Sequence, residues 1–148
     1  MKQVEVNKEA KLSEHFKLGE LTRSKSHPEI YNIPSRQVIE NLKRVCVWLE
    51  ALRERYNEPI IITSGYRSAE LNRKVGGVAT SNHLTGCAVD IRVTGKEQLI
   101  RYACILLDYA DETKQEFDEL LLEHGANGVI WLHFAVRPQG NRRKIGFL

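Results

Sequence analysis

Two long stretches of the chain place apolar residues at the spacing of an amphipathic α-helix. Between residues 36 and 56 the apolar residues recur every three or four positions, so that one stripe would face a core. They are Val38, Leu42, Val45, Leu49 and Leu52. Ser35, just before this stretch, is a residue type that commonly caps a helix. We predict helices over 36–56 and 96–109, and a shorter one over 69–75.

Four shorter segments show the β-branched or alternating pattern of strands. They are residues 60–63, 87–93, 117–122 and 129–136. In 87–93 and 129–136 alternate residues are apolar, so each strand would have one apolar face and one mixed face. Residues 125–128 are turn-forming and join the last two strands. The order of elements predicts an α+β fold with a mostly antiparallel sheet flanked by helices.

The composition is that of an ordinary globular chain. The 148 residues are 42% hydrophobic and 28% charged, which favours a single domain over residues 1–148. No apolar run reaches the ~18 residues of a transmembrane segment, and no secretory signal is recognisable. The formal charge of +3 is small and scattered, so we expect no nucleic-acid partner. We also expect a monomer. The basic cluster 142–144 is interpreted as a solvated tail, with contact to an acidic polymer as the alternative.

The three cysteines are odd in number and form no CxxC pair. A complete set of disulfides is therefore impossible. Cys46 and Cys104 lie in apolar helical patterns, and we expect both to be buried. Together with the missing signal, this pattern favours folding in a reducing compartment.

Chemistry-bearing residues gather on the mixed faces of two predicted strands. Asp90 shares its face with small or polar neighbours, and His133 shares its face with Trp131. His83 precedes Gly86 in the loop before the first strand, where a tight bend could bring its imidazole over the same face. Two imidazoles and one carboxylate are the donors of a catalytic zinc site, which keeps a fourth position for water and activates that water. Taken singly, each of these residues is better explained by a structural or surface role than by metal binding.

The motifs around these residues resemble those of the M15 family of zinc peptidases. The matching segments are Ser64-Gly65-Tyr66-Arg67-Ser68, Leu71-Asn72, Gly76-Gly77, Ser81-x-His83-x-x-Gly86-x-Ala88-x-Asp90-Ile91 and Trp131-x-His133-Phe134. The opening 13–21 and the closing 141–143 are similar to the short phage and bacterial branch of the family. The resemblance covers nearly the whole chain. It implies a fold like that of hedgehog domains and D-Ala-D-Ala peptidases.

The resemblance assigns roles residue by residue. It makes His83, Asp90 and His133 the zinc ligands. Arg67 would lie beside the substrate and stabilise an oxyanion, unless it only ties its loop to backbone carbonyls. Ser81 would hydrogen-bond the substrate, or serve only as a turn residue. The strand pattern adds Trp131, which shares the face of His133 and would form a wall of the substrate cleft or simply cover the sheet.

The position of the general base differs from that in the best-known branches of the M15 family. They carry an acid three residues before the last zinc-binding histidine, where this chain has Ile130. The short branch has an acid at the end of the preceding strand, which points to Glu123 as the base and to Glu119 as the second candidate. The alternative is that both are solvated carboxylates.

These observations predict a zinc-dependent peptidase that hydrolyses peptidoglycan stem peptides, as a D-Ala-D-Ala carboxypeptidase or a phage endolysin does. The alternative is an inactive, zinc-stabilised binding or phage structural module. Ile130 favours that alternative, and the retained Arg67 disfavours it. Because no signal peptide is recognisable, we expect cytoplasmic synthesis. The substrate lies outside the membrane, so we expect action on the wall after release, as for a phage or prophage enzyme.

Overall fold

The computed structural model of the protein describes residues 7–24, 26–30 and 32–148. The helices are α1 (Leu18–Thr22), α2 (Arg36–Tyr56), α3 (Ala69–Lys74), the 3-10 helix η1 (Asn82–Thr85) and α4 (Lys96–Thr113). The strands are β1 (Ile62–Ser64), β2 (Ala88–Arg92), β3 (Glu119–His124), β4 (Ile130–Ala135) and β5 (Lys144–Phe147). They form one sheet in the order β1-β2-β4-β3-β5. The β3–β5 pair is parallel and the other neighbouring pairs are antiparallel, which confirms the predicted fold class.

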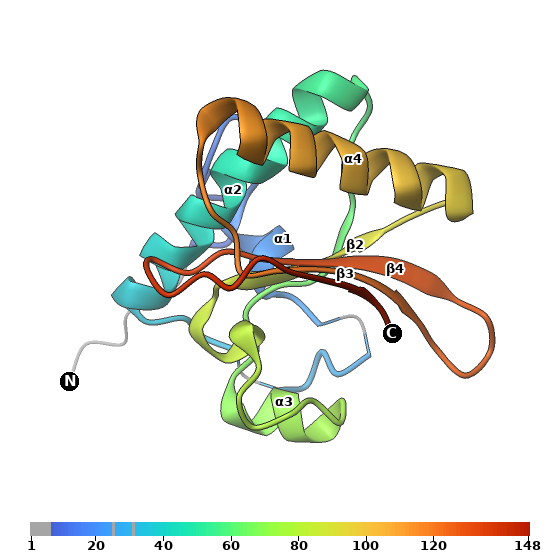
Figure 1. Cartoon of the computed structure of the whole chain (residues 1–148). Helices are drawn as coiled ribbons and strands as arrows, with labels where there is room; N and C mark the ends of the chain where they lie inside the picture. The colour runs from blue at the N-terminus through green and yellow to red at the C-terminus, as the bar shows by residue number, and fades with distance from the viewer. Residues whose placement is uncertain (1–6, 25, 31) are drawn as a thin grey trace.

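Helices α2 and α4 lie on one face of the sheet, and α3 lies on the other (Figure 1). The predicted bounds of α2 are confirmed. The helix begins after Ser35, whose hydroxyl accepts a hydrogen bond from the Val38 N–H at 3.2 Å and caps the first turn. Asn57 ends the helix in the left-handed conformation, with φ 61°. All five apolar positions of the predicted stripe are buried. The amphipathic pattern thus fixes α2 against the sheet.

The face of the sheet toward α2 and α4 forms the hydrophobic core. Val89, Ile91, Leu132 and Phe134 of β2 and β4 are completely buried. Trp48 of α2 packs on Phe134 with ring centroids 5.2 Å apart. Trp48 and Phe134 are both almost completely buried and belong to this core.

The opposite face of the same strands carries the polar residues. In the register of β2 and β4, Asp90 pairs with His133. Glu123 of β3 pairs with Trp131. Glu119 pairs with Ala135 and, four residues before Glu123, lies on the same face of β3. Because side chains alternate along a strand, Asp90, His133, Glu119 and Glu123 all lie on the face away from α2.

The C-terminal segment differs from the prediction. Residues 144–147 form β5, which adds to β3 at the edge of the sheet. The N–H groups of Arg143 and Lys144 donate to the carbonyl oxygens of Phe117 and Asp118, both at 2.9 Å. The interpretation of 142–144 as a solvated tail was wrong, because a four-residue edge strand gives little periodic signal and depends on a distant partner.

The prediction for the cysteines was right for Cys46 and wrong for Cys104. Burial raises the pKa of the Cys46 thiol to about 12, whereas Cys104 is exposed. The buried stripe of α4 runs through Leu99, Tyr102, Ala103, Leu106 and Ala110. Cys104 lies one position beyond Ala103 and faces outward. Within the described ranges, no helix combines the length and the apolar character needed to cross a bilayer.

Candidate metal centre

His83 is directed toward the sheet by the tight bend that follows η1. Gly86 has φ 76°, and a Cβ there would lie 2.8 Å from a methyl carbon of Val38, so only glycine fits this bend. The imidazole Nδ1 of His83 lies 2.7 Å from the carbonyl oxygen of Gly65. This carbonyl can only accept, so Nδ1 carries the hydrogen. The other nitrogen, Nε2, lies 3.3 Å from Asp90 Oδ1.

His133 reaches the same carboxylate from β4. Its Nδ1 lies 3.0 Å from Asp90 Oδ1, and its Nε2 lies 3.0 Å from Glu119 Oε1. The rings of His83 and His133 are 5.2 Å apart between centroids. One ligand atom from each of His83, Asp90 and His133 lies within 4.8 Å of the other two. The structure therefore brings together the three residues that the strand pattern had predicted to converge.

The donor set fits a zinc ion by number, kind and setting. All three side chains are buried, and two nitrogens with one carboxylate oxygen leave a tetrahedral position open. Each imidazole turns one nitrogen toward Asp90 and the other toward an acceptor, Gly65 or Glu119. Metal-binding histidines in proteins commonly have this second contact, because it orients the ring. In the part of the chain that the structure describes, no other group of His, Cys, Asp or Glu meets the same criterion.

The contacts within the site shift the pKa values of His133 and Asp90 in opposite directions. Burial disfavours the charged imidazolium of His133, but hydrogen bonds with Asp90 and Glu119 outweigh burial and raise its pKa to about 9. Burial also opposes the charge of Asp90, yet the two histidines hold its pKa well below the usual range. A metal ion must displace the proton from His133 Nδ1, since a ligand nitrogen has to be deprotonated.

Arg67 lies beside this cluster, and its guanidinium contacts three side chains. It donates from Nη2 to Asp90 Oδ2 at 3.2 Å and from Nε to Ser64 Oγ at 3.0 Å. A third bond runs from Nη1 to Asn72 Oδ1 at 3.3 Å. At Gly77 a Cβ would come 2.0 Å from that Asn72 oxygen, so the glycine lets the loop close over this pair. Among the described residues, the guanidinium therefore contacts side chains and does not tie the loop to backbone carbonyls.

The two candidate acids have different surroundings. The hydrogen bond to His133 holds the pKa of Glu119 below its ordinary value. Burial raises the pKa of the partly buried Glu123, and the charge on His133 only partly offsets this. The indole N–H of Trp131 also lowers the pKa of Glu123. The indole N–H does not reach hydrogen-bond geometry with Glu123, however, and Trp131 Nε1 is buried without a partner among the described residues. Glu123 therefore resembles a proton-transfer group more than Glu119 does.

Ser81 and Trp131 lie near the site in ways that fit their simpler interpretations. The Ser81 hydroxyl accepts a hydrogen bond from the His83 N–H at 3.1 Å and so stabilises the turn. Trp131 is partly buried and shares the face of His133, two residues away.

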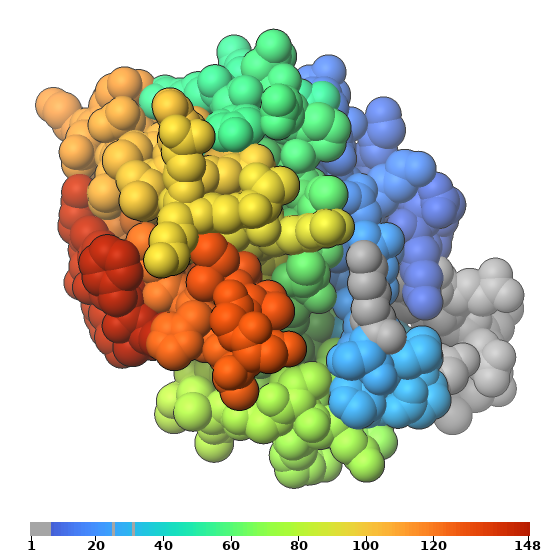
Figure 2. Space-filling view, turned by 90° about the vertical axis from the view of Figure 1, so that its right-hand side faces the viewer, coloured from blue at the N-terminus to red at the C-terminus, as the bar shows by residue number. Residues whose placement is uncertain are grey.

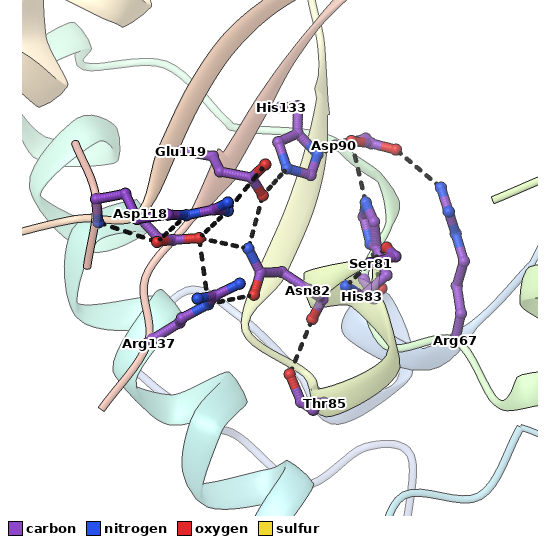
Figure 3. A network of polar contacts seen from close by, with 12 residues as sticks. Arg67, Ser81, Asn82, His83, Thr85, Asp90, Asp118, Glu119, His133 and Arg137 are labelled. Atoms are coloured by element: carbon purple, nitrogen blue, oxygen red, sulfur yellow. Dashed lines mark hydrogen bonds and ion pairs between the residues drawn. The ribbon is translucent and has the colours of Figure 1, made fainter. Parts of the chain in front are cut away.

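The sequence did not point to the polar network behind His133. Figure 3 shows Asn82, Asp118 and Arg137 joined to Glu119 by hydrogen bonds and ion pairs. Arg142 also belongs to this network through a two-point contact with Asp118. The available signals were weak: Asn82 is an unassigned position of the motif around His83, and Asp118 directly precedes Glu119.

A small pocket adjoins Arg67 on the surface. It has a volume of about 210 Å³. Its lining includes Arg23, Ser24, Ser26, Thr63, Ser64, Arg67, Leu71 and Val75. In Figure 2 the surface is hollowed between residues 26–30, in light blue, and the α3 region, in light green. A larger groove of about 970 Å³ lies between the end of α2 and α4, and its lining includes the exposed Cys104 but neither Arg67 nor any of the three candidate ligands.

Comparison with protein families gives this geometry a context. The family described as Peptidase M15 matches residues 14–117, which is more than half of the chain. The match includes Arg67, His83 and Asp90. Glu119, Glu123 and His133 lie beyond it and come to the site by strand pairing. The comparison with curated proteins found no match. On the strength of the family match, the chain belongs to the M15 peptidase family.

Proposed function

We propose that this protein is a zinc-dependent peptidase that hydrolyses peptide bonds in peptidoglycan stem peptides. Family membership supports the peptidase activity. The observation that carries the proposal is the buried cluster of His83, Asp90 and His133, with Arg67 on one side and Glu123 on the same face of the sheet. The choice of peptidoglycan rests on the likeness of the motifs to those of carboxypeptidases and endolysins.

His83 Nε2, a carboxylate oxygen of Asp90 and His133 Nδ1 would hold the zinc ion, since these atoms face one another. Bound zinc supplies a Lewis acid for the scissile carbonyl and lowers the pKa of a bound water. Arg67 would bind the carbonyl oxygen as negative charge develops on it. A guanidinium suits this task because it stays charged and its donors keep a fixed geometry.

Glu123 would transfer the protons of the reaction. Its carboxylate would take a proton from the attacking water and deliver it to the nitrogen of the leaving amine. A pKa raised by burial brings the group closer to the working pH, which makes both steps easier. Glu119 suits this role less, because His133 and Asn82 already occupy its Oε1.

The neighbouring residues would shape the substrate site. Trp131 lies opposite Glu123 in the β3–β4 register, and its ring would form a wall of the cleft. Ser81 would donate its hydroxyl proton to the substrate while it accepts the hydrogen bond from the His83 N–H.

A zinc-stabilised module without turnover is the second candidate. Ile130 favours it, because this residue stands where well-known branches of the family have their acid. Against it, Glu123 places a carboxylate on the same face from a different strand. Arg67 also remains beside the ligands, where a purely structural site would not need it.

The direct test is to incubate the zinc-loaded protein with defined muropeptides and to identify the products by mass spectrometry. We expect cleavage by the wild type and none by His133→Ala. Release of a terminal D-Ala would indicate a carboxypeptidase, and an internal cut would indicate an endopeptidase. A wild-type protein that holds zinc but cleaves no cell-wall peptide would contradict the proposal and favour the inactive module.

A further inference from the structure

A chain of polar side chains begins directly behind His133, on the side away from Asp90. Glu119 Oε1 contacts His133 Nε2 at 3.0 Å, and the same oxygen accepts a hydrogen bond from Asn82 Nδ2 at 2.6 Å. Asn82 Nδ2 also donates to Asp118 Oδ2 at 2.8 Å (Figure 3). Asn82 directly precedes the candidate ligand His83 in η1. Its side-chain amide therefore connects η1 to Glu119 of β3, which contacts the second histidine, His133.

Asp118 anchors this chain from the interior. Its side chain is completely buried, and Arg142 binds both carboxylate oxygens, with Nε to Oδ1 at 3.0 Å and Nη2 to Oδ2 at 2.8 Å. Arg137 Nε lies 3.2 Å from Asp118 Oδ2 and donates to Asn82 Oδ1 at 2.8 Å. Burial works against the charge of Asp118, but the bonds from Arg142 and Asn82 hold its pKa at about 2. Asp118 is therefore an ionised, rigidly held group.

The arrangement gives the two nitrogens of His133 different neighbours. Nδ1 faces the candidate ligand Asp90, and Nε2 faces Glu119. A nitrogen that binds metal gives up its proton, so Nδ1 would be the ligand atom while Glu119 accepts a hydrogen bond from Nε2–H. A glutamate side chain has several rotatable bonds and would not hold this position alone. Asn82 fixes Glu119 Oε1, and Arg142 Nη2 lies 3.6 Å from the other oxygen.

We propose that Glu119 is a positioning residue of the metal centre, and that residues 137–142 hold it in place through Asn82 and Asp118. The proposal rests on the zinc site of the proposed function. It gives Glu119 a role different from that of Glu123, and it makes the segment after β4 part of the metal centre. Contacts of this kind orient a ligand, and their loss costs roughly 10- to 100-fold in metal affinity.

The test measures the zinc affinity of the full chain by competition with a chromophoric chelator, and the visible absorption of the cobalt form. Glu119→Ala should bind zinc about 10- to 100-fold more weakly and change the cobalt spectrum. Glu119→Gln should recover most of the affinity, because its amide oxygen can still accept from His133 Nε2. Arg142→Ala should show a smaller loss, since Arg137 and Asn82 still contact Asp118.

Arg143→Ala is the matched control. Arg143 follows Arg142 directly, but it pairs with Asp111 at 3.0 Å and lies over the ring of Phe117, outside the network. Circular dichroism would establish that each variant is folded. Zinc binding by Glu119→Ala as tight as that of the wild type, with an unchanged cobalt spectrum, would overturn the proposal. If Glu119→Ala does not fold, equal affinities of Arg142→Ala and Arg143→Ala would overturn it instead. A wild type that binds no zinc would refute the proposed function as well, so the two failures are distinguishable.

Discussion

Strands β2 and β4 have one apolar face and one polar face, although the residues of the two faces alternate along the same backbone. Val89, Ile91 and Phe134 face α2 and are completely buried in the apolar core. Asp90 and His133, their direct neighbours in sequence, face the other side and contact each other at 3.0 Å. A step of one residue therefore separates the core from the candidate site. Stability and activity should be separable by mutation in the same two strands.

The energetic balance of the two faces differs as well. Burial of apolar side chains stabilises the core face directly. Burial of charged groups is costly and is offset only where each group has partners. Asp90 has partners in His83, His133 and Arg67. The polar face is thus held together by its network of contacts, and removal of one member should affect the others more than it affects the core.

The largest expected effect is a loss of activity without a loss of zinc in a variant of Glu123, which shares the face of the metal ligands but is not one of them. Glu123→Gln should lower kcat about 100- to 10,000-fold, because a neutral amide cannot transfer the proton. The zinc content should stay at the wild-type level, since Glu123 is not a ligand. Steady-state kinetics on a muropeptide, with zinc determined on the same sample, would check both. Wild-type kcat in this variant would exclude Glu123 as the base.

A core substitution should show the reverse pattern. Phe134→Ala removes a completely buried ring that packs on Trp48, and should lower the free energy of unfolding by about 3–5 kcal/mol. The protein that remains folded should still bind zinc. Phe147 is 84% exposed, and Phe147→Ala should change the stability by roughly 0.5 kcal/mol or less. Urea unfolding of the three proteins would measure the difference, and equal losses in both variants would contradict the assignment of faces.

Sequence patterns predicted the parts of the molecule that depend on local order. The stripe of α2 and the alternation around Asp90 and His133 were correct because a helix and a strand each impose a short period on burial. The polar network was not predictable in this way. Asn82 and Asp118 are 36 residues apart, and Asp118 and Arg142 are 24 apart. No local period connects such residues, so their contacts became visible only when the strands were placed side by side.

Glu119 shows why a position on a strand does not decide a role. The sequence made Glu123 the first candidate base and Glu119 the second. The structure gives Glu119 two hydrogen-bond partners on one oxygen and leaves Glu123 with a pKa raised by burial. This distinction depends on side-chain geometry that residue types and spacing do not contain.

Arg67 offers a test within the polar face. Arg67→Ala should lower kcat/KM about 100- to 1,000-fold, the loss typical when a donor to a developing oxyanion is removed. Arg73 lies in α3 and is exposed, so Arg73→Ala should leave kcat/KM unchanged. Kinetics on one muropeptide would compare the two. An equal and small effect in both variants would make Arg67 a structural residue.

The smallest expected effect concerns the acid stability of the network. The pKa of Asp118 falls from an ordinary 3.8 to about 2 in the folded protein. A depressed folded pKa adds stability that is fully present above pH ~4 and is lost as the pH falls through about 2. The contribution is about 2 kcal/mol. Urea unfolding between pH 6 and 2 should show a weaker acid dependence in Arg142→Ala than in Arg143→Ala. An identical pH dependence in the two variants would contradict this assignment.

The most direct test of the central claim is the zinc stoichiometry of the purified protein and of two single variants. If His83, Asp90 and His133 bind zinc, atomic absorption should find one zinc ion per chain in the wild type. His83→Ala and His133→Ala, folded by circular dichroism, should hold far less at the same free zinc concentration. Full stoichiometry in both variants would contradict the site.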